Sequence, residues 1–140
     1  MTDCPNVPVA TLRVRYSEID QMGTFYNSRA LEWFEVGRTE WLRGTGMAYT
    51  DMESRGVMLP LVESHVNYRS RARYDDELAI FVTASMQGRA RMEFAVTITQ
   101  AATGEVVCEG TTVHAIVAPG GKVIRPPAWF LDLVQTGNEQ

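Results

Sequence analysis

The chain has 140 residues, of which 45% are hydrophobic and 21% charged, as is ordinary for a globular protein. Its formal net charge of −4 argues against a general nucleic-acid binder, which would carry a strongly basic surface. No apolar run approaches the ~20 residues that a membrane span requires. We therefore expect one domain over residues 1–140, with no nucleic-acid partner and no membrane partner.

The cysteines and histidines offer no metal site. Cys4 and Cys108 are isolated, lack the CxxC spacing of zinc sites, and fit reduced thiols in a cytoplasmic protein. His65 and His114 lie in strand-like segments, and neither has a second ligand at metal spacing. The N-terminus has neither the basic nor the long apolar region of a signal peptide. We expect a cytoplasmic location, no metal and no cofactor.

The first third of the chain predicts a strand, a turn and a long helix. Residues 1–8 form a loose lead-in, and residues 9–17 alternate with the period of two of a half-buried strand. A turn over residues 20–25 is centred on Gly23. A helix from Arg29 to about Arg43 follows, with Asn27 or Ser28 as its capping side chain and an apolar stripe made of Ala30, Leu31, Phe34, Gly37, Trp41 and Leu42.

The remaining segments predict mainly strands. A short helix is expected at residues 49–54, and a C-terminal helix at residues 128–134 precedes a loose tail at 135–140. Four strand-like segments lie between these helices, and the second and third of them read as a hairpin. They cover residues 57–69, 77–86, 91–100 and 105–118.

This order predicts the α+β class, with a five-stranded antiparallel sheet that wraps around one long central helix. A single sheet leaves edge strands exposed, and exposed edges are usually paired or covered. We therefore expect a homodimer that joins two sheets edge to edge, with a dimer of dimers as a further option.

Asp20 stands just before the helix start, where unpaired N–H groups attract negative charge. It is either a turn or capping acid or a catalytic carboxylate acting on a group that those N–H groups bind. Basic residues also cluster: Arg89 and Arg91 alternate at the start of a strand, and a weaker set covers residues 69–73. Such clusters suit phosphate groups, or they decorate a solvated edge.

The stretch DQMGTFYNSRALEWFEVGRTEWL resembles the signature of the hotdog-fold acyl-CoA thioesterases, specifically the 4-hydroxybenzoyl-CoA thioesterase group. The signature has an Asp, a Gly three residues on, and Asn, His or Tyr at the seventh position, here Asp20, Gly23 and Asn27. A helix that reads Leu-x-Trp-Phe-Glu and then Arg-Thr-Glu-Trp-Leu follows. The resemblance continues through residues 59–68 and 74–78, and it covers nearly the whole chain.

The resemblance implies a hotdog fold, an active site at a dimer interface, and hydrolysis of an acyl-CoA or acyl-carrier-protein thioester to the free acid and thiol. Asp20 is then the nucleophile or general base, and the backbone N–H of Asn27 is the oxyanion donor. Other residues are expected to bind the substrate or coenzyme A: Tyr26, Ala30, Val62, Arg89 and Arg91. Glu35 is a weaker second candidate acid, which the helix spacing pairs with Arg38 or Thr39.

Two positions depart from the group. Ala30 stands where Tyr is common, and Asn27 stands where the enzyme that named the group has Tyr. A small Ala30 on the pocket side would enlarge the acyl site, so we expect an aliphatic acyl group of medium or long chain, with or without hydroxyl groups or branches. Two alternatives remain: a non-catalytic acyl-CoA-binding module, and a hotdog hydratase or dehydratase, which would need a histidine beside the acid.

Overall fold

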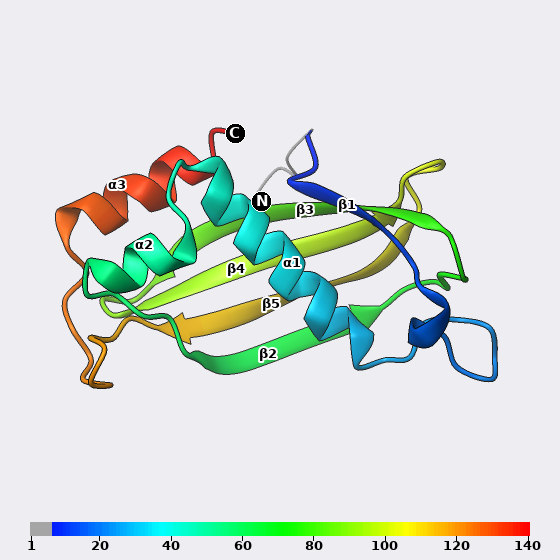
Figure 1. Ribbon diagram of the computed structural model, residues 1–140, viewed down its shortest axis with the longest axis horizontal. Helices are drawn as coiled ribbons and strands as arrows, with labels where there is room; N and C mark the ends of the chain where they lie inside the picture. Colours follow the sequence, from blue (N-terminus) through cyan, green and yellow to red (C-terminus); the bar gives the residue numbers. More distant parts are fainter. Residues whose placement is uncertain (1–6) are drawn as a thin grey trace.

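The computed structural model describes residues 7–140, and it shows one antiparallel sheet with a long helix, α1 (Arg29–Gly44), across one face (Figure 1). The five strands have the spatial order β1-β3-β4-β5-β2. They are β1 (Ala10–Arg13), β2 (Leu61–Tyr68), β3 (Glu77–Gln87), β4 (Arg91–Gln100) and β5 (Val106–Ala115). The other helices are the 3-10 turn η1 (Tyr16–Glu18), α2 (Tyr49–Ser54) and α3 (Ala128–Gly137). The predicted α+β hotdog architecture is confirmed.

The strand pairings show which local predictions hold. The hairpin of β3 and β4 is in continuous register from Leu78 opposite Gln100 to Gln87 opposite Arg91. At the edges of the sheet lie β1, which pairs with β3, and β2, which pairs with β5. Within residues 7–140, no helix has the length and apolar character needed to cross a membrane.

Helix α1 packs on the sheet through one face, as its spacing predicts, but one position differs. Leu31 is 40% exposed, whereas Trp33, which the predicted stripe leaves out, is buried. Gly37 packs directly on β3, where an added Cβ would lie 2.7 Å from the Ile80 side chain. Glycine therefore fits this position better than any residue with a Cβ. The buried face comprises Ala30, Trp33, Phe34, Gly37, Trp41 and Leu42.

Three strands are shorter than predicted, and one of them is β5, which was expected over residues 105–118 but covers Val106–Ala115. The first was expected to reach residue 17, but β1 ends at Arg13 because η1 turns the chain away from the sheet. The second was expected over residues 57–69, yet β2 covers only Leu61–Tyr68 and has an irregular register next to its start. The predicted lead-in at residues 1–8 lies mostly outside the described residues, as does Cys4.

The prediction of a loose tail at residues 135–140 is wrong. Helix α3 continues to Gly137, and the Asn138 amide pairs with the backbone of Ala84 through bonds of 2.8 and 2.6 Å. The Gln140 side chain donates to the Trp41 carbonyl at 2.8 Å. The tail thus closes over α1 and β3, because its polar side chains find backbone partners there.

Candidate active site

The segment from Ile19 to Asn27, called here the Asp20 loop, folds back on itself just before α1. Ile19 forms an antiparallel bridge with Phe25, and the Asp20 N–H donates to the Thr24 carbonyl at 2.8 Å. Gly23 has a φ of +79°, a conformation that side chains disfavour, and its N–H closes the turn on the Asp20 carbonyl. The glycine of the sequence signature is therefore needed to hold the turn around the acid.

The Asp20 carboxylate is half-buried within this loop. Its Oδ1 accepts the Met22 N–H at 2.8 Å, which is the geometry of an Asx turn. Its other oxygen has no hydrogen-bond partner among residues 7–140. One carboxylate oxygen therefore stabilises the turn, and the other remains free for chemistry.

Asn27 does not cap α1 as expected. The helix begins after Ser28, which has helical dihedral angles, and no side-chain capping bond is formed. The Asn27 carbonyl instead accepts the Tyr68 hydroxyl at 2.6 Å and the Ala30 N–H at 3.3 Å. The Asn27 N–H has no partner in the described part of the chain. This N–H is therefore free to donate. Tyr68 of β2 holds Asn27 in place through the bond to its carbonyl.

Glu18, which the sequence analysis did not single out, ties this loop to the helix. Its side chain is buried and accepts the Arg15 N–H at 2.7 Å and the Trp33 Nε1–H at 2.8 Å. Burial alone would raise the pKa of Glu18, but these bonds and the nearby Arg15 guanidinium outweigh it, and the pKa is lowered. No local spacing pairs residues 18 and 33, so only the fold reveals this anchor.

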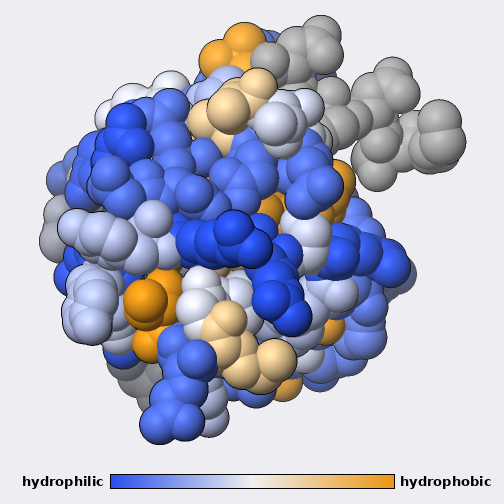
Figure 2. Space-filling model, turned by 90° about the vertical axis from the view of Figure 1, so that its right-hand side faces the viewer, coloured by the Kyte–Doolittle hydropathy of each residue, from blue (hydrophilic) through white to orange (hydrophobic). Residues whose placement is uncertain are grey.

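A second anchor comes from the segment between β2 and β3. The Ala72 carbonyl accepts the Phe25 N–H at 2.9 Å and the Thr24 hydroxyl at 3.3 Å. Exposed Arg71 and Arg73 flank Ala72, so they lie beside the Asp20 loop. This end of the molecule, viewed in Figure 2, is mainly hydrophilic, with apolar residues in small separate areas.

The fold separates the other expected coenzyme A-binding arginines from this loop within one chain. Arg89 and Arg91 are exposed where β3 ends and β4 begins, whereas the Asp20 loop lies near the start of β3. At ~3.3 Å per residue, the 11 residues of β3 place these two ends about 33 Å apart. The set at residues 69–73, which the sequence ranked lower, is closer to Asp20.

The remaining expected site residues lie in three different environments. Tyr26 is 53% exposed beside Asn27. Val62 is 47% exposed on the edge strand β2, and its place in the strand is about 20 Å from Tyr68. Ala30 is fully buried in the hydrophobic core, with no surface open to the loop's solvent side. Of these three residues, only Tyr26 lies in the Asp20 loop.

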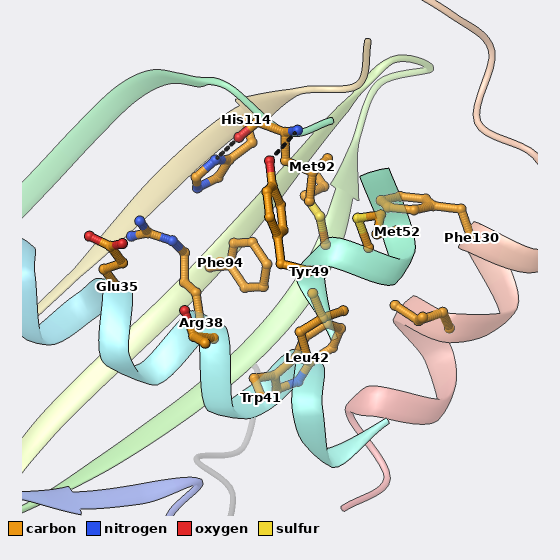
Figure 3. A pocket seen from close by; sticks show the side chains of 13 residues that line it. Glu35, Arg38, Trp41, Leu42, Tyr49, Met52, Met92, Phe94, His114 and Phe130 are labelled. Atoms are coloured by element: carbon orange, nitrogen blue, oxygen red, sulfur yellow. Dashed lines mark hydrogen bonds between the residues drawn. The ribbon is translucent and has the colours of Figure 1, made fainter. Parts of the chain in front are cut away.

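A cavity of about 300 Å³ lies farther along α1, between that helix, α2, α3 and the sheet (Figure 3). Glu35, Arg38 and His114 line it together with mostly apolar side chains, and Asp20 is not among its residues. Glu35 forms no ion pair within residues 7–140, so its expected partnership with Arg38 is absent. The described residues contain no group of three or more His, Cys, Asp or Glu side chains placed to hold a metal.

The sheet wrapped on one long helix is the hotdog fold, and an acid lies in the loop before that helix. The model of the family described as "Thioesterase-like superfamily" matches residues 14–134. This match covers most of the chain, which therefore belongs to the thioesterase-like superfamily and is a hydrolase of the thioesterase class.

Individual relatives agree with this membership. The chain is 39% identical over 69 residues to the Bacillus subtilis protein described as "Putative acyl-CoA thioesterase YneP", which is 49% of this chain and half of that relative's length. A DHNA-CoA thioesterase structure from Staphylococcus aureus is 27% identical, with a TM-score of 0.80 over 93% of this chain and 87% of that one. A 1,4-dihydroxy-2-naphthoyl-CoA thioesterase from Synechocystis, 20% identical, has the same fold, with a TM-score of 0.81 over 90% and 93% of the chains.

Proposed function

We propose that the protein hydrolyses an acyl-CoA thioester, with Asp20 as the catalytic carboxylate and the Asn27 N–H as the oxyanion donor. One observation carries the proposal: within residues 7–140, the same anchored loop presents a carboxylate oxygen and a backbone N–H that both lack hydrogen-bond partners. The family membership and the named CoA thioesterases among the similar proteins support the substrate class. An acyl-carrier-protein thioester presents the same reacting bond and remains the alternative carrier.

The chemistry needs an attacking oxygen, an oxyanion site and a leaving thiolate. Asp20 either attacks the carbonyl carbon to give a mixed anhydride, which water then hydrolyses, or removes a proton from the attacking water. The carbonyl oxygen gains negative charge and accepts the Asn27 N–H, which the positive end of the α1 dipole assists. The C–S bond breaks, and the thiolate leaves without a general acid because a thiol has a pKa near 8.5.

We propose a homodimer through the β2 edge as the complete form of the site. The β2 strand has one unpaired side, and Leu61 and Val62 are 51% and 47% exposed on it. Unpaired edges favour pairing with another strand. In this arrangement the partner's copies of Arg89 and Arg91 are candidates for the coenzyme A phosphates, alongside Arg71 and Arg73 of the same chain.

Other side chains are poorly placed for competing chemistry. A hydratase would need a histidine beside Asp20, but both ring nitrogens of His114 are already bonded, to Leu59 and Thr112. Cys108 is buried, and burial raises the pKa of its thiol to about 12, so it is not a nucleophile at neutral pH. A purely acyl-CoA-binding module remains the second candidate, favoured only by the fold.

The decisive experiment measures thiol release from a series of acyl-CoAs by the purified protein. We expect Asp20→Asn to lower kcat by about 100-fold or more, since the loss of a general base or nucleophile has this effect. Asn27→Ala is the matched control: it removes the side chain but keeps the backbone N–H, so activity should change little. An Asp20→Asn variant that hydrolyses as fast as the wild type would overturn the mechanism.

A further inference from the structure

The cavity along α1 has a charged, exposed end and an apolar, buried end. Figure 3 shows Glu35 and Arg38 on one side of it and Met52 and Phe130 on the other. Glu35 is exposed and Arg38 half-buried, whereas Met52 and Phe130 have no exposed surface. The cavity volume of about 300 Å³ is at the lower end of the range for small-molecule sites. A ligand would therefore place a polar group at Arg38 and hydrocarbon at the far end.

Arg38 is the unusual member of this lining. Its guanidinium is half-buried, yet within residues 7–140 no carboxylate lies within 4.0 Å of it and no oxygen accepts its N–H groups. A guanidinium presents five donors, and those of Arg38 keep some contact with solvent, since Trp41 Nε1 alone is fully buried without a partner among the side chains of residues 7–140. Burial still lowers the pKa of Arg38, although Glu35 nearby counteracts the effect. An anion bound at this position would supply the missing acceptors.

The bonds of the neighbouring polar groups, His114 and Tyr49, leave Arg38 as the cationic group for an anion. His114 Nδ1 donates to the Leu59 carbonyl at 3.0 Å, so its Nε2 accepts the Thr112 hydroxyl at 3.0 Å. Burial, the largest influence, lowers the pKa of His114 and keeps it neutral at pH 7. The Tyr49 hydroxyl oxygen accepts the Leu59 N–H at 3.1 Å, which leaves its own hydrogen free to donate.

We propose that this cavity binds an aliphatic carboxylic acid, with its carboxylate on Arg38 and the Tyr49 hydroxyl and its chain toward Met52 and Phe130. A guanidinium matches a carboxylate through two parallel hydrogen bonds. The chain gains free energy from each methylene group that leaves water. Arg38 is about 14 Å along the helix axis from Arg29, so this site is separate from the Asp20 loop and does not depend on its chemistry. Thioester hydrolysis forms acids of this kind, so the ligand is either the product or a free fatty acid.

Isothermal titration of the full chain with straight-chain carboxylates from hexanoate to dodecanoate tests the proposal. Affinity should rise by about fourfold per methylene group until the cavity is full. Arg38→Gln should weaken binding about tenfold or more, because a charge-assisted bond is lost. Glu35→Gln should tighten it by about twofold to fivefold, since a like charge is removed. Primary alcohols of the same lengths, which carry no charge, should bind the wild type and Arg38→Gln equally.

Asp20→Asn separates this site from the catalytic proposal, because it should lower kcat by about 100-fold or more and leave carboxylate affinity unchanged. Two results would overturn the proposal: carboxylate affinity that does not grow with chain length, or equal carboxylate affinity in the wild type and Arg38→Gln. The chain-length series needs only the wild-type protein, so it decides even if a variant fails to fold.

Discussion

Trp33 and Trp41 lie on the same buried face of α1, and their surroundings differ in a way that separates the two ends of the helix. The Trp33 Nε1–H donates to Glu18 at 2.8 Å, while the Trp41 Nε1–H is buried without a partner among the described residues. Near Trp33, the polar groups that anchor the Asp20 loop are paired. Near the cavity, the Trp41 indole N–H and the Arg38 guanidinium have no partners among the described residues.

This difference fits two tasks. A loop that must hold a carboxylate and a free N–H at fixed positions needs its supporting bonds complete, because small displacements of reacting groups are costly in rate. A cavity that receives a ligand can keep donors unpaired, because the ligand completes them. The anchored end is therefore expected to lose stability when its partners are removed, and the cavity end to gain it when a ligand binds.

The largest effect should come from Glu18→Ala. This change leaves a buried donor, the Trp33 Nε1–H, and a part-buried one, the Arg15 N–H, without an acceptor, so we expect the free energy of unfolding to fall by about 3 kcal/mol. Urea denaturation followed by tryptophan fluorescence measures it. Glu32→Ala is the control, because Glu32 is itself exposed and bonds only half-buried Arg29, so its loss should be below about 1 kcal/mol. Equal losses in both variants would contradict the role of Glu18 as the anchor.

Much of this frame could be predicted from the sequence, because local patterns specify it. The bounds of α2 and β4 follow from composition and alternation, and the start of α1 and the glycine turn beside Asp20 follow from spacing. The predictions that failed concern contacts between residues that are distant in the sequence. Trp33 is buried instead of Leu31 because Glu18 and Phe25 pack against it, with ring centroids 4.9 Å apart for the Phe25–Trp33 pair.

The candidate site shows the same division between local motif and distant contacts. The acid and the helix start were expected from one continuous motif, whereas the contact of Tyr68 with Asn27 joins residues 41 positions apart. Likewise, nothing in the local sequence shows that Arg71 and Arg73 lie nearer to Asp20 than Arg89 and Arg91 do. Sheet topology decides these distances, and the order β1-β3-β4-β5-β2 was not predicted.

A direct test of the comparison replaces each tryptophan by phenylalanine. Both changes remove part of a buried ring, but only Trp33→Phe also removes a hydrogen bond to a carboxylate. We expect Trp33→Phe to lower the free energy of unfolding by about 1.5 kcal/mol more than Trp41→Phe does. The difference between the two urea midpoints, at equal slopes, measures this quantity. If the two variants lose the same stability, the bond to Glu18 contributes nothing net.

A smaller effect is expected for Tyr68→Phe, and it should appear in the rate. The change removes only the hydroxyl that holds the Asn27 carbonyl at 2.6 Å, so the oxyanion donor becomes less well positioned. We expect kcat to fall about threefold to tenfold with little change in KM, since the lost support matters mainly in the transition state. Tyr74→Phe is the matched control, because Tyr74 is 56% exposed and its hydroxyl has no described partner. A shift in KM alone would show that Tyr68 contacts substrate and does not position the loop.

The smallest expected effect is a pH dependence that originates at Glu18. Because the folded pKa of Glu18 lies below its ordinary value of 4.5, the folded state favours the ionised form. Its contribution to stability is complete above pH 4.5 and is lost as the pH falls through the folded pKa. Glu18→Gln keeps the shape but cannot ionise, so its stability should fall less steeply than that of the wild type below pH 4.5. Urea midpoints at a series of pH values compare the two slopes, and parallel curves would place the acid sensitivity in other carboxylates of the chain.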